Sequence, residues 1–270
     1  VLLRTPGYAG FSLLDLHDYP MQGTALVGPL DAFWESKGFI TPEAYRKFCG
    51  PTVPLLRLPK RTYTIDEPFT ATADLSHFGP ADLPEAKPVW SIKDQGGREI
   101  ASGSLATLSA PTGKLSSLGS LNASLATAKA PAKLTVTLSA AGFSNDWEIW
   151  VYPAKSPAVP PANVMVSHVW DDATKAALAD GKRVVLFPGK TNPALTLRGG
   201  FLPVFWSPVW FPQQQPNTNS ILCDPRHALF AEFPTELHGN WQWWHLLNNS
   251  HTLILDDSPA TFRPIVQVVD

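Results

Sequence analysis

The sequence predicts a chain of three parts: a strand-and-helix unit of a barrel, a β-sandwich and an α/β domain. A short apolar run at residues 11–16 is followed by a loop and a capped helix at residues 42–49. Residues 52–153 are rich in Thr and Ser and alternate apolar with polar side chains, as strands with one buried face do. After a proline-rich stretch, a strand, helix and strand pattern occupies residues 164–187.

Bulk properties exclude several classes of partner. The chain has 270 residues, of which 44% are hydrophobic and 16% charged, so it can bury sizeable cores. The formal net charge of −2 attracts neither nucleic acid nor an anionic membrane. No apolar run approaches the roughly 20 residues that span a bilayer. Since the chain starts at Val1 inside an apolar element, we expect it to be an internal piece of a longer polypeptide.

Polar residues follow the first apolar run. Asp15, His17 and Asp18 stand at the end of the predicted buried strand at residues 11–16. In a barrel of alternating strands and helices, substrate is met at this end of a strand. Strand alternation places Asp15 and His17 on the same face. Aromatic residues in the next loop, including Trp34, offer the flat apolar surface on which sugar rings pack.

The helix predicted at residues 42–49 has clear boundary signals. Thr41 is a helix N-cap, Pro42 suits the first helical position, and Glu43 places an acid in the first turn. Gly50 and Pro51 end the helix. One strand and one helix cannot cover both faces of a parallel sheet, so residues 1–50 are predicted to be the last, incomplete unit of a barrel.

A family resemblance rests on this region. It is carried by the apolar run with Asp15 and the nearby Asp18, a glycine-punctuated loop, and the segment Ile-Thr-Pro-Glu-Ala-Tyr-Arg-Lys-Phe at residues 40–48. In these features residues 10–49 resemble the last barrel strand and following loop of the glycoside hydrolase family 2 (β-galactosidase-like) enzymes. Leu14 stands where that family usually has Trp. The resemblance implies a (β/α)8 barrel, hydrolysis of O-glycosidic bonds with retention, a carbohydrate substrate and a secreted or periplasmic enzyme.

The resemblance also implies that the catalytic residues lie outside this chain. Family 2 enzymes use two glutamates on strands that precede the last one. Residues 1–50 contain only Glu35 and Glu43, in the loop and at the helix start. We therefore predict that no residue of this chain is catalytic and that the chain alone does not turn over substrate.

Substrate-binding residues are nevertheless expected in the first part of the chain. The candidates are Asp15, His17, Asp18, Gln22 and Trp34. They would contact sugar hydroxyls or orient the missing glutamates through hydrogen bonds. The alternative is a polar cluster that ties loops together at the end of a strand.

Residues 51–154 are predicted to form the sandwich. Short strands with turn signals between them are expected at residues 62–66, 69–75, 88–94, 132–139 and 147–152. Trp90 is the candidate core aromatic. Leucines in residues 102–130 recur every three or four positions, which hints at a helix, but the Ser and Gly content favours strands and loops. The resemblance implies an immunoglobulin-like sandwich here.

Residues 155–161 are rich in proline and predict a stiff linker. Beyond it, a strand at residues 164–170, a helix at 173–180 and a strand at 183–187 predict a βαβ unit. Further strands are expected at residues 253–255 and 265–269. We predict that residues 162–270 form a flavodoxin-like or glutamine-amidotransferase-like α/β accessory domain, truncated at its end.

This last part carries no catalytic signature. Cys223 does not lie on a glycine-flanked turn after a strand, as an amidotransferase nucleophile would. Its histidines lack the spacing of metal ligands, so neither a metal nor a cofactor is expected. Cys49 and Cys223 are predicted to be unpaired, buried or half-buried thiols.

The aromatic cluster at Trp241, Trp243 and Trp244 allows two interpretations. The surrounding leucines favour packing, whereas an exposed strip would stack on sugar rings. A second hypothesis is therefore a non-catalytic carbohydrate-binding or scaffolding protein. The sequence leaves open whether the protein is a monomer or a homo-oligomer.

Overall fold

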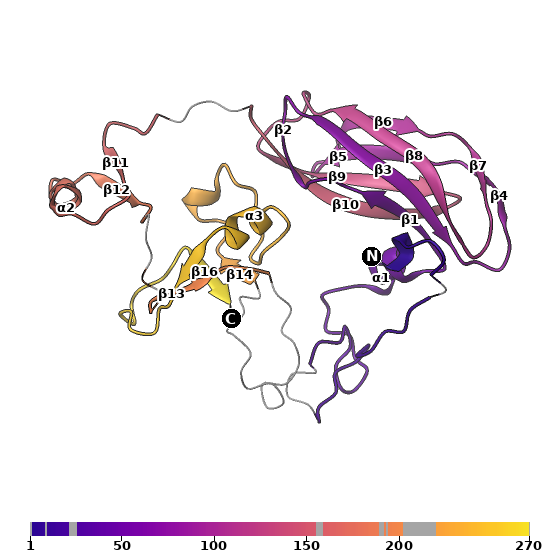
Figure 1. The fold of residues 1–270 in the computed structure, drawn as a ribbon, viewed down its shortest axis with the longest axis horizontal. Coiled ribbons are helices and arrows are strands. Elements are labelled where there is room, and N and C mark those ends of the chain that lie inside the picture. Colours follow the sequence, from indigo (N-terminus) through magenta and orange to yellow (C-terminus); the bar gives the residue numbers. More distant parts are fainter. Residues whose placement is uncertain are drawn as a thin grey trace. The chain divides into compact units, whose positions relative to one another are not determined.

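The computed structural model describes residues 2–8, 10–21, 26–154, 159–188, 192, 194–201 and 220–269 (Figure 1). The chain divides into two compact units. Unit 1 contains the described residues of Val1–Ala154 and Pro225–Thr235. Unit 2 contains those of Lys155–Pro203, Pro216–Asp224 and Glu236–Asp270. No described helix has the length and apolarity needed to cross a membrane.

Unit 1 is built around a β-sandwich, whose layers are visible in Figure 1. One sheet has the order β1 (Thr52–Arg57), β3 (Pro68–His77), β8 (Lys114–Ser124). The other has the order β2 (Thr62–Thr64), β10 (Phe143–Tyr152), β9 (Ala132–Ala140), β5 (Val89–Asp94), β6 (Glu99–Ser104). A short pair, β4 (Leu83–Ala86) and β7 (Leu108–Ala110), stands beside them. The β2–β10 pair is parallel and the other pairs in these sheets are antiparallel.

Alternating side chains from both sheets form one core. In β9 the inward positions Leu134, Val136 and Leu138 are fully buried, while the residues between them are partly exposed. Phe69 of β3 and Ile149 of β10 belong to the same core. This is the period-2 pattern expected for strands with one buried face. The predicted sandwich strands are therefore confirmed.

Two further sandwich predictions are also confirmed. Trp90 is buried on β5, where its ring packs against Gly103 of the neighbouring β6. Residues 102–130 form strands and loops rather than a helix. On β8, Leu118 and Leu121 are both buried although they are three residues apart, because a bulge in the β3–β8 ladder beside Gly119, at φ +112, shifts the register.

The buried Tyr63 makes the sandwich sensitive to alkaline pH. Its side chain is 2% exposed and its hydroxyl donates to the Lys60 carbonyl at 3.2 Å. Burial raises its pKa from 10 to about 12. Burial also raises the pKa of Tyr152. The folded state favours the neutral phenol of Tyr63. The contribution of this side chain to the free energy of unfolding is therefore complete below pH 10 and is lost as the pH rises towards 12.

We therefore expect the free energy of unfolding to fall between pH 10 and pH 12, and to fall less in Tyr63→Phe. Denaturant unfolding followed by tryptophan fluorescence, with tyrosinate absorbance on the same samples, measures both effects. Identical pH profiles for the two proteins would show that Tyr63 does not titrate in this range.

The helix α1 (Pro42–Cys49) has the predicted boundaries. The Thr41 side chain accepts from the Ala44 amide at 3.2 Å, which caps the first turn. An ion pair between Lys47 and Asp146 of β10 joins the helix to the sandwich. Its aromatic side chains Tyr45 and Phe48 pack together, with ring centroids 4.9 Å apart.

The predicted strand at residues 11–16 is wrong. These residues have no strand conformation, and Leu14 is 85% exposed. A strand needs ladder partners, and among the described residues this region makes only the bridge between His17 and Leu30. The described part of the chain therefore shows no terminal strand of a (β/α)8 barrel.

Unit 2 begins with the predicted βαβ unit. β11 (Val164–Ser167) and β12 (Arg183–Leu186) are parallel neighbours, and α2 (Asp172–Ala179) connects them. The Asp171 side chain caps α2 by accepting from the Thr174 amide at 2.9 Å. Gly181, with φ +82, takes the left-handed conformation that suits a helix end.

The remaining strands of unit 2 correct the prediction of a flavodoxin-like sheet. β13 (Thr196–Arg198) pairs with β15 (His251–Leu253), and β14 (Ser220–Cys223) pairs with β16 (Val266–Val269). Both pairs are antiparallel, so the described residues of unit 2 form three two-stranded sheets rather than one parallel sheet. The helix α3 (Trp243–Asn248) lies between β14 and β15 in sequence. The short helices η1 (Leu2–Arg4) and η2 (Ala228–Phe230) belong to unit 1.

Candidate functional site

The loop after the first apolar run is held by short backbone pairings. The Asp18 amide donates to the Leu30 carbonyl at 3.0 Å, and the Leu30 amide donates to the Leu16 carbonyl at 3.2 Å. Leu30 also pairs with Ser36. These pairings bring residues 16–18 beside residues 28–37, which defines the candidate site.

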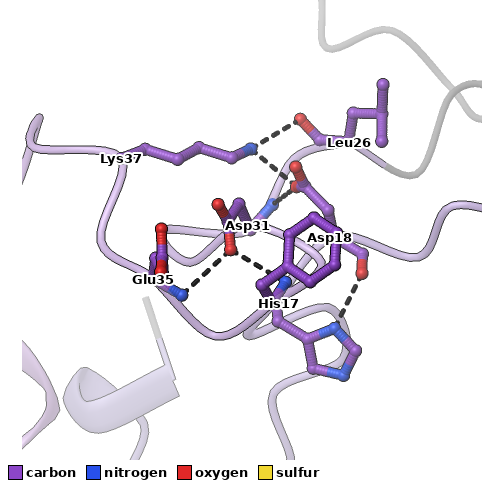
Figure 2. A network of polar contacts seen from close by, with 8 residues as sticks. His17, Asp18, Leu26, Asp31, Glu35 and Lys37 are labelled. Carbon is purple, nitrogen blue, oxygen red and sulfur yellow. Dashed lines mark hydrogen bonds and ion pairs between the residues drawn. The ribbon is translucent and has the colours of Figure 1, made fainter.

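A buried carboxylate anchors the site (Figure 2). Asp18 is 7% exposed, and its Oδ1 accepts from the Gly28 amide at 3.1 Å and from Lys37 Nζ at 2.6 Å. Lys37 Nζ also donates to the Leu26 carbonyl at 3.1 Å. A buried charge is tolerated when it is paired and hydrogen-bonded, and here one carboxylate joins two distant parts of the loop.

Gly28 is required for this close approach. A Cβ atom at position 28 would lie 2.6 Å from the His17 carbonyl carbon and 2.8 Å from the Leu16 oxygen. Both are backbone atoms that cannot swing away. The absence of a side chain at Gly28 therefore lets its amide reach Asp18.

A second aspartate shapes the turn that follows. Asp31 Oδ1 accepts from the Phe33 amide at 2.8 Å and from the Glu35 amide at 2.9 Å. The Trp34 amide donates to the Asp31 carbonyl at 3.1 Å. An aspartate that binds the backbone after itself stabilises a tight turn without a helix or strand. Figure 2 shows Asp31 on the inner side of this turn.

The turn presents two exposed aromatic side chains. Phe33 is 84% exposed and Trp34 is 61% exposed. Trp34 has φ +68, a left-handed conformation that is uncommon for a bulky residue. Its ring lies 4.4 Å from the His17 ring, centroid to centroid, at an angle of 39°. His17 Nδ1 lies 2.7 Å from the Asp18 carbonyl, which only accepts, so Nδ1 donates and Nε2 is left as an acceptor in the neutral ring.

The structure brings three of the predicted site residues together: His17, Asp18 and Trp34. Asp15 is half-buried with φ +63, and because no strand forms here, the predicted alternation of Asp15 with His17 does not apply. Gln22 lies outside the described residues. One oxygen of Asp18 is already occupied by the Gly28 amide and Lys37 Nζ, so the other oxygen is the one left for a further contact.

Sequence reasoning missed Asp31, Lys37 and Gly28. Asp31 had a usable signal, because an aspartate in a loop commonly accepts from the backbone amide two residues further on. Lys37 had none, since its partner Asp18 is 19 positions away.

Glu43 does not have the environment of a catalytic acid. Glu43 is solvent-exposed, and hydrogen bonds from its own amide and from Thr41 lower its pKa. A general acid in a glycosidase needs a raised pKa. The Glu35 amide is bound by Asp31 within the turn. The site presents an exposed indole ring beside an imidazole.

A pocket of about 210 Å³ lies elsewhere in unit 1, between the N-terminal turn and the ends of β3 and β8. Tyr8, Phe11 and Phe78 give it an apolar lining. None of the predicted sugar contacts lines it.

In unit 2 the tryptophan cluster is split. Trp243 is 8% exposed and packs into the unit, as predicted for the cluster. Trp241 and Trp244 are 53% and 41% exposed, contrary to that prediction, because the turn and first residues of α3 point them outwards. Trp244 stacks on Phe201, with centroids 5.8 Å apart and planes 13° apart.

Cys49 is half-buried and Cys223 is buried, as predicted. The Cys223 thiol donates to the Glu236 carbonyl at 3.2 Å. Within the described ranges, no three His, Cys, Asp or Glu side chains gather in a way that could hold a metal ion.

Two family models match parts of the chain. Residues 67–153 match a model described as "Domain of unknown function (DUF8488)", and residues 165–270 match one described as "Domain of unknown function (DUF8487)". The first falls within the sandwich and the second within the predicted accessory region. A search of curated proteins found no match.

Solved structures resemble the chain weakly. An alkylpurine DNA glycosylase, AlkC, from Pseudomonas fluorescens is 13% identical with a TM-score of 0.32, over 38% of this chain and 30% of that one. The sporulation control protein Spo0M from Bacillus subtilis is 14% identical with a TM-score of 0.31, over 39% and 51%. A β-glucuronidase from Parabacteroides merdae is 13% identical with a TM-score of 0.27, over 37% and 13%.

These three proteins have different descriptions, and each of the three matches covers about half or less of the other protein. One of them is a glycoside hydrolase, at low similarity, and together they establish no function for this chain. The fold that the chain itself shows is β-rich, with several separate sheets.

Proposed function

We propose that this chain is the C-terminal portion of a β-galactosidase-like glycoside hydrolase of family 2, and that residues 10–39 contact its sugar substrate. Under this proposal the sandwich is an immunoglobulin-like accessory domain. The catalytic glutamates belong to another part of the same polypeptide. The support comes from the resemblance of residues 10–49 to that family and from the geometry of the candidate site.

The aromatic turn carries the proposal. A left-handed backbone costs a non-glycine residue about 1–2 kcal/mol. At Trp34 the hydrogen bonds of the Asp31 turn offset this cost. The turn thereby holds a bulky ring that is 61% exposed. Strain of this kind gathers at ligand-contacting sites, where surrounding structure maintains it. A flat indole beside an imidazole is a suitable surface for the apolar face of a sugar ring.

The exposure of neighbouring side chains agrees with a covered surface in the intact enzyme. Large hydrophobic side chains between positions 11 and 39 are more than a third exposed. They are Phe11, Leu13, Leu14, Leu16, Tyr19, Met21, Leu26, Val27, Phe33, Trp34 and Phe39. Soluble proteins rarely leave large contiguous apolar patches open to water, and such patches mark interaction sites. A barrel that precedes these residues in a longer polypeptide would cover many of them.

Under this proposal, catalysis and substrate positioning belong to different parts of the polypeptide. A retaining glycosidase places two carboxyl groups about 5 Å apart, one as general acid and one as nucleophile. This chain would add positioning: Trp34 and His17 hold the ring, while Asp15 accepts from sugar hydroxyls. Asp18 keeps the loop in shape through Gly28 and Lys37.

The test uses the polypeptide extended on its N-terminal side and a panel of 4-nitrophenyl glycosides, the β-galactoside and β-glucuronide among them. We expect hydrolysis of at least one, and a fall in kcat/KM of about ten-fold or more in Asp15→Ala, which is roughly 1.4 kcal/mol of transition-state stabilisation. Asp172→Ala, which alters a fully exposed carboxylate in α2, is the matched control.

Wild-type kcat/KM in Asp15→Ala would remove Asp15 from the site. Absence of hydrolysis together with saturable quenching of tryptophan fluorescence by oligosaccharides would favour the second candidate, a non-catalytic carbohydrate-binding protein. The exposed Trp241 and the Trp244–Phe201 stack favour that candidate.

A further inference from the structure

The outer face of the five-stranded sheet contains a shallow, open hollow near its edge strand. It lies over β6, β5 and β9 and shares no residue with the candidate site. Five of its lining residues carry hydroxyl groups: Ser91, Ser102, Ser104, Thr137 and Ser139. Such a concentration of hydroxyls in one concave area is a feature that the proposed hydrolase does not use.

The strand register aligns these hydroxyls in rows. Ser91 of β5 stands opposite Ser102 of β6 on one side and opposite Thr137 of β9 on the other. Neighbouring strands lie about 4.8 Å apart, so the three hydroxyls form a row across the sheet at that spacing.

A parallel row begins at Val89. This residue stands opposite Ser104 of β6 and Ser139 of β9, so an apolar side chain lies between two hydroxyls. Val89 is 50% exposed. The hollow therefore combines polar groups with an exposed apolar contact point at Val89.

The hydroxyls differ in their hydrogen-bonding state. Thr137 donates to Asp146 Oδ1 at 2.8 Å, and Ser102 donates to Glu99 Oε1 at 2.7 Å. Both oxygens are thereby left as acceptors towards the hollow. The hydroxyls of Ser91 and Ser139 make no hydrogen bond to any residue that the structure describes, so they can turn to donate or accept.

We propose that this hollow binds a neutral, polyhydroxylated ligand, namely a stretch of uncharged oligosaccharide. Sugar hydroxyls both donate and accept, which matches fixed acceptors beside rotatable hydroxyls, and the C–H face of a sugar ring suits Val89. An anion is disfavoured because Glu99 is the one charged residue lining the hollow. An apolar ligand would strip water from the hydroxyls and leave them unpaired.

This surface is distinct from the candidate site of residues 16–18 and 28–37, and it does not depend on the chain's being part of a hydrolase. It would hold a glycan chain on the sandwich without acting on it. Its affinity is expected to be weak, because the hollow is open and few groups are ordered in advance.

The test is a titration of the full chain with cellotetraose, maltotetraose and xylotetraose, each alone, followed by amide chemical shifts. We expect saturable shifts at Ser91, Gly103 and Thr137 with at least one sugar. The double variant Ser91→Ala/Ser139→Ala should weaken that binding roughly ten-fold, from two lost hydrogen bonds. Ser117→Ala/Ser120→Ala, on exposed positions of β8, should bind as the wild type does.

The amide spectrum of each variant also reports whether it is folded. Absence of saturable shifts in the hollow with all three sugars would overturn the proposal. Unchanged affinity in folded Ser91→Ala/Ser139→Ala would overturn it as well.

Discussion

Replacing Phe69 with alanine is expected to lower the free energy of unfolding of the sandwich by about 3–5 kcal/mol. Phe69 is fully buried on β3, and its ring lies 5.7 Å from that of Tyr63, centroid to centroid. Truncation removes the transfer free energy of the ring and leaves a cavity that strands on both sides hold open. Denaturant unfolding measures the change.

Phe143→Ala is the matched control, because Phe143 begins β10 in the same sandwich but is 38% exposed. Its truncation should cost about 1 kcal/mol or less. Equal losses in the two variants would mean that the two sheets do not share the core described above.

Replacing Asp18 with alanine is expected to make local opening of the candidate-site loop more frequent, while the sandwich stays folded. The change removes the acceptor for the Gly28 amide and leaves the Lys37 ammonium, 27% exposed, without its carboxylate. Truncating one partner of a buried ion pair costs 3–5 kcal/mol, and the partial exposure of Lys37 reduces this to about 2 kcal/mol. Local opening should therefore become roughly thirty-fold more frequent.

Amide hydrogen exchange measures this effect directly. Protection should fall at Gly28 and Leu30 and stay unchanged at Ile149 in the core. Asp18→Asn keeps an acceptor for Gly28 but loses the charge, so it should have an intermediate effect. Unchanged protection at Gly28 in Asp18→Ala would show that the carboxylate does not hold the loop.

Local signals made several elements predictable from sequence. Thr41, Pro42 and Gly50 determine the ends of α1, because capping and helix termination depend on residues within one turn. The alternation of apolar and polar residues identified β9, because every second side chain of this strand points into the core between the two sheets. The βαβ unit of unit 2 was also predictable, since a helix that is capped by Asp171 lies between two short apolar strands in the sequence.

Residues 11–16 show the limit of such signals. Their apolar character predicts that they are buried. It indicates neither the surface that buries them nor the conformation of their backbone. In the described structure they are exposed loop residues, and Leu14 is 85% exposed. A strand prediction assumed ladder partners that sequence alone cannot supply.

The candidate site was predictable in its residue types more than in its geometry. His17, Asp18 and Trp34 were identified and do meet. The ion pair of Asp18 with Lys37 and the left-handed backbone of Trp34 arise from contacts distant in sequence. In unit 2, one βαβ unit suggested a continuous parallel sheet. The later strands instead pair antiparallel with partners far along the chain, and no local pattern in the sequence indicates such pairings.

The activity of Trp34→Gly in the extended polypeptide tests most directly whether the aromatic turn contacts substrate. Glycine takes φ +68 without strain, so the variant should keep or gain stability while losing the ring. We predict an intact fold and a fall in kcat/KM on the preferred aryl glycoside of about ten-fold or more. Trp170→Ala, which removes a tryptophan of unit 2 that is 53% exposed, should leave kcat/KM unchanged. Full wild-type kcat/KM in a folded Trp34→Gly protein would contradict the assignment of a sugar-binding role to residues 10–39.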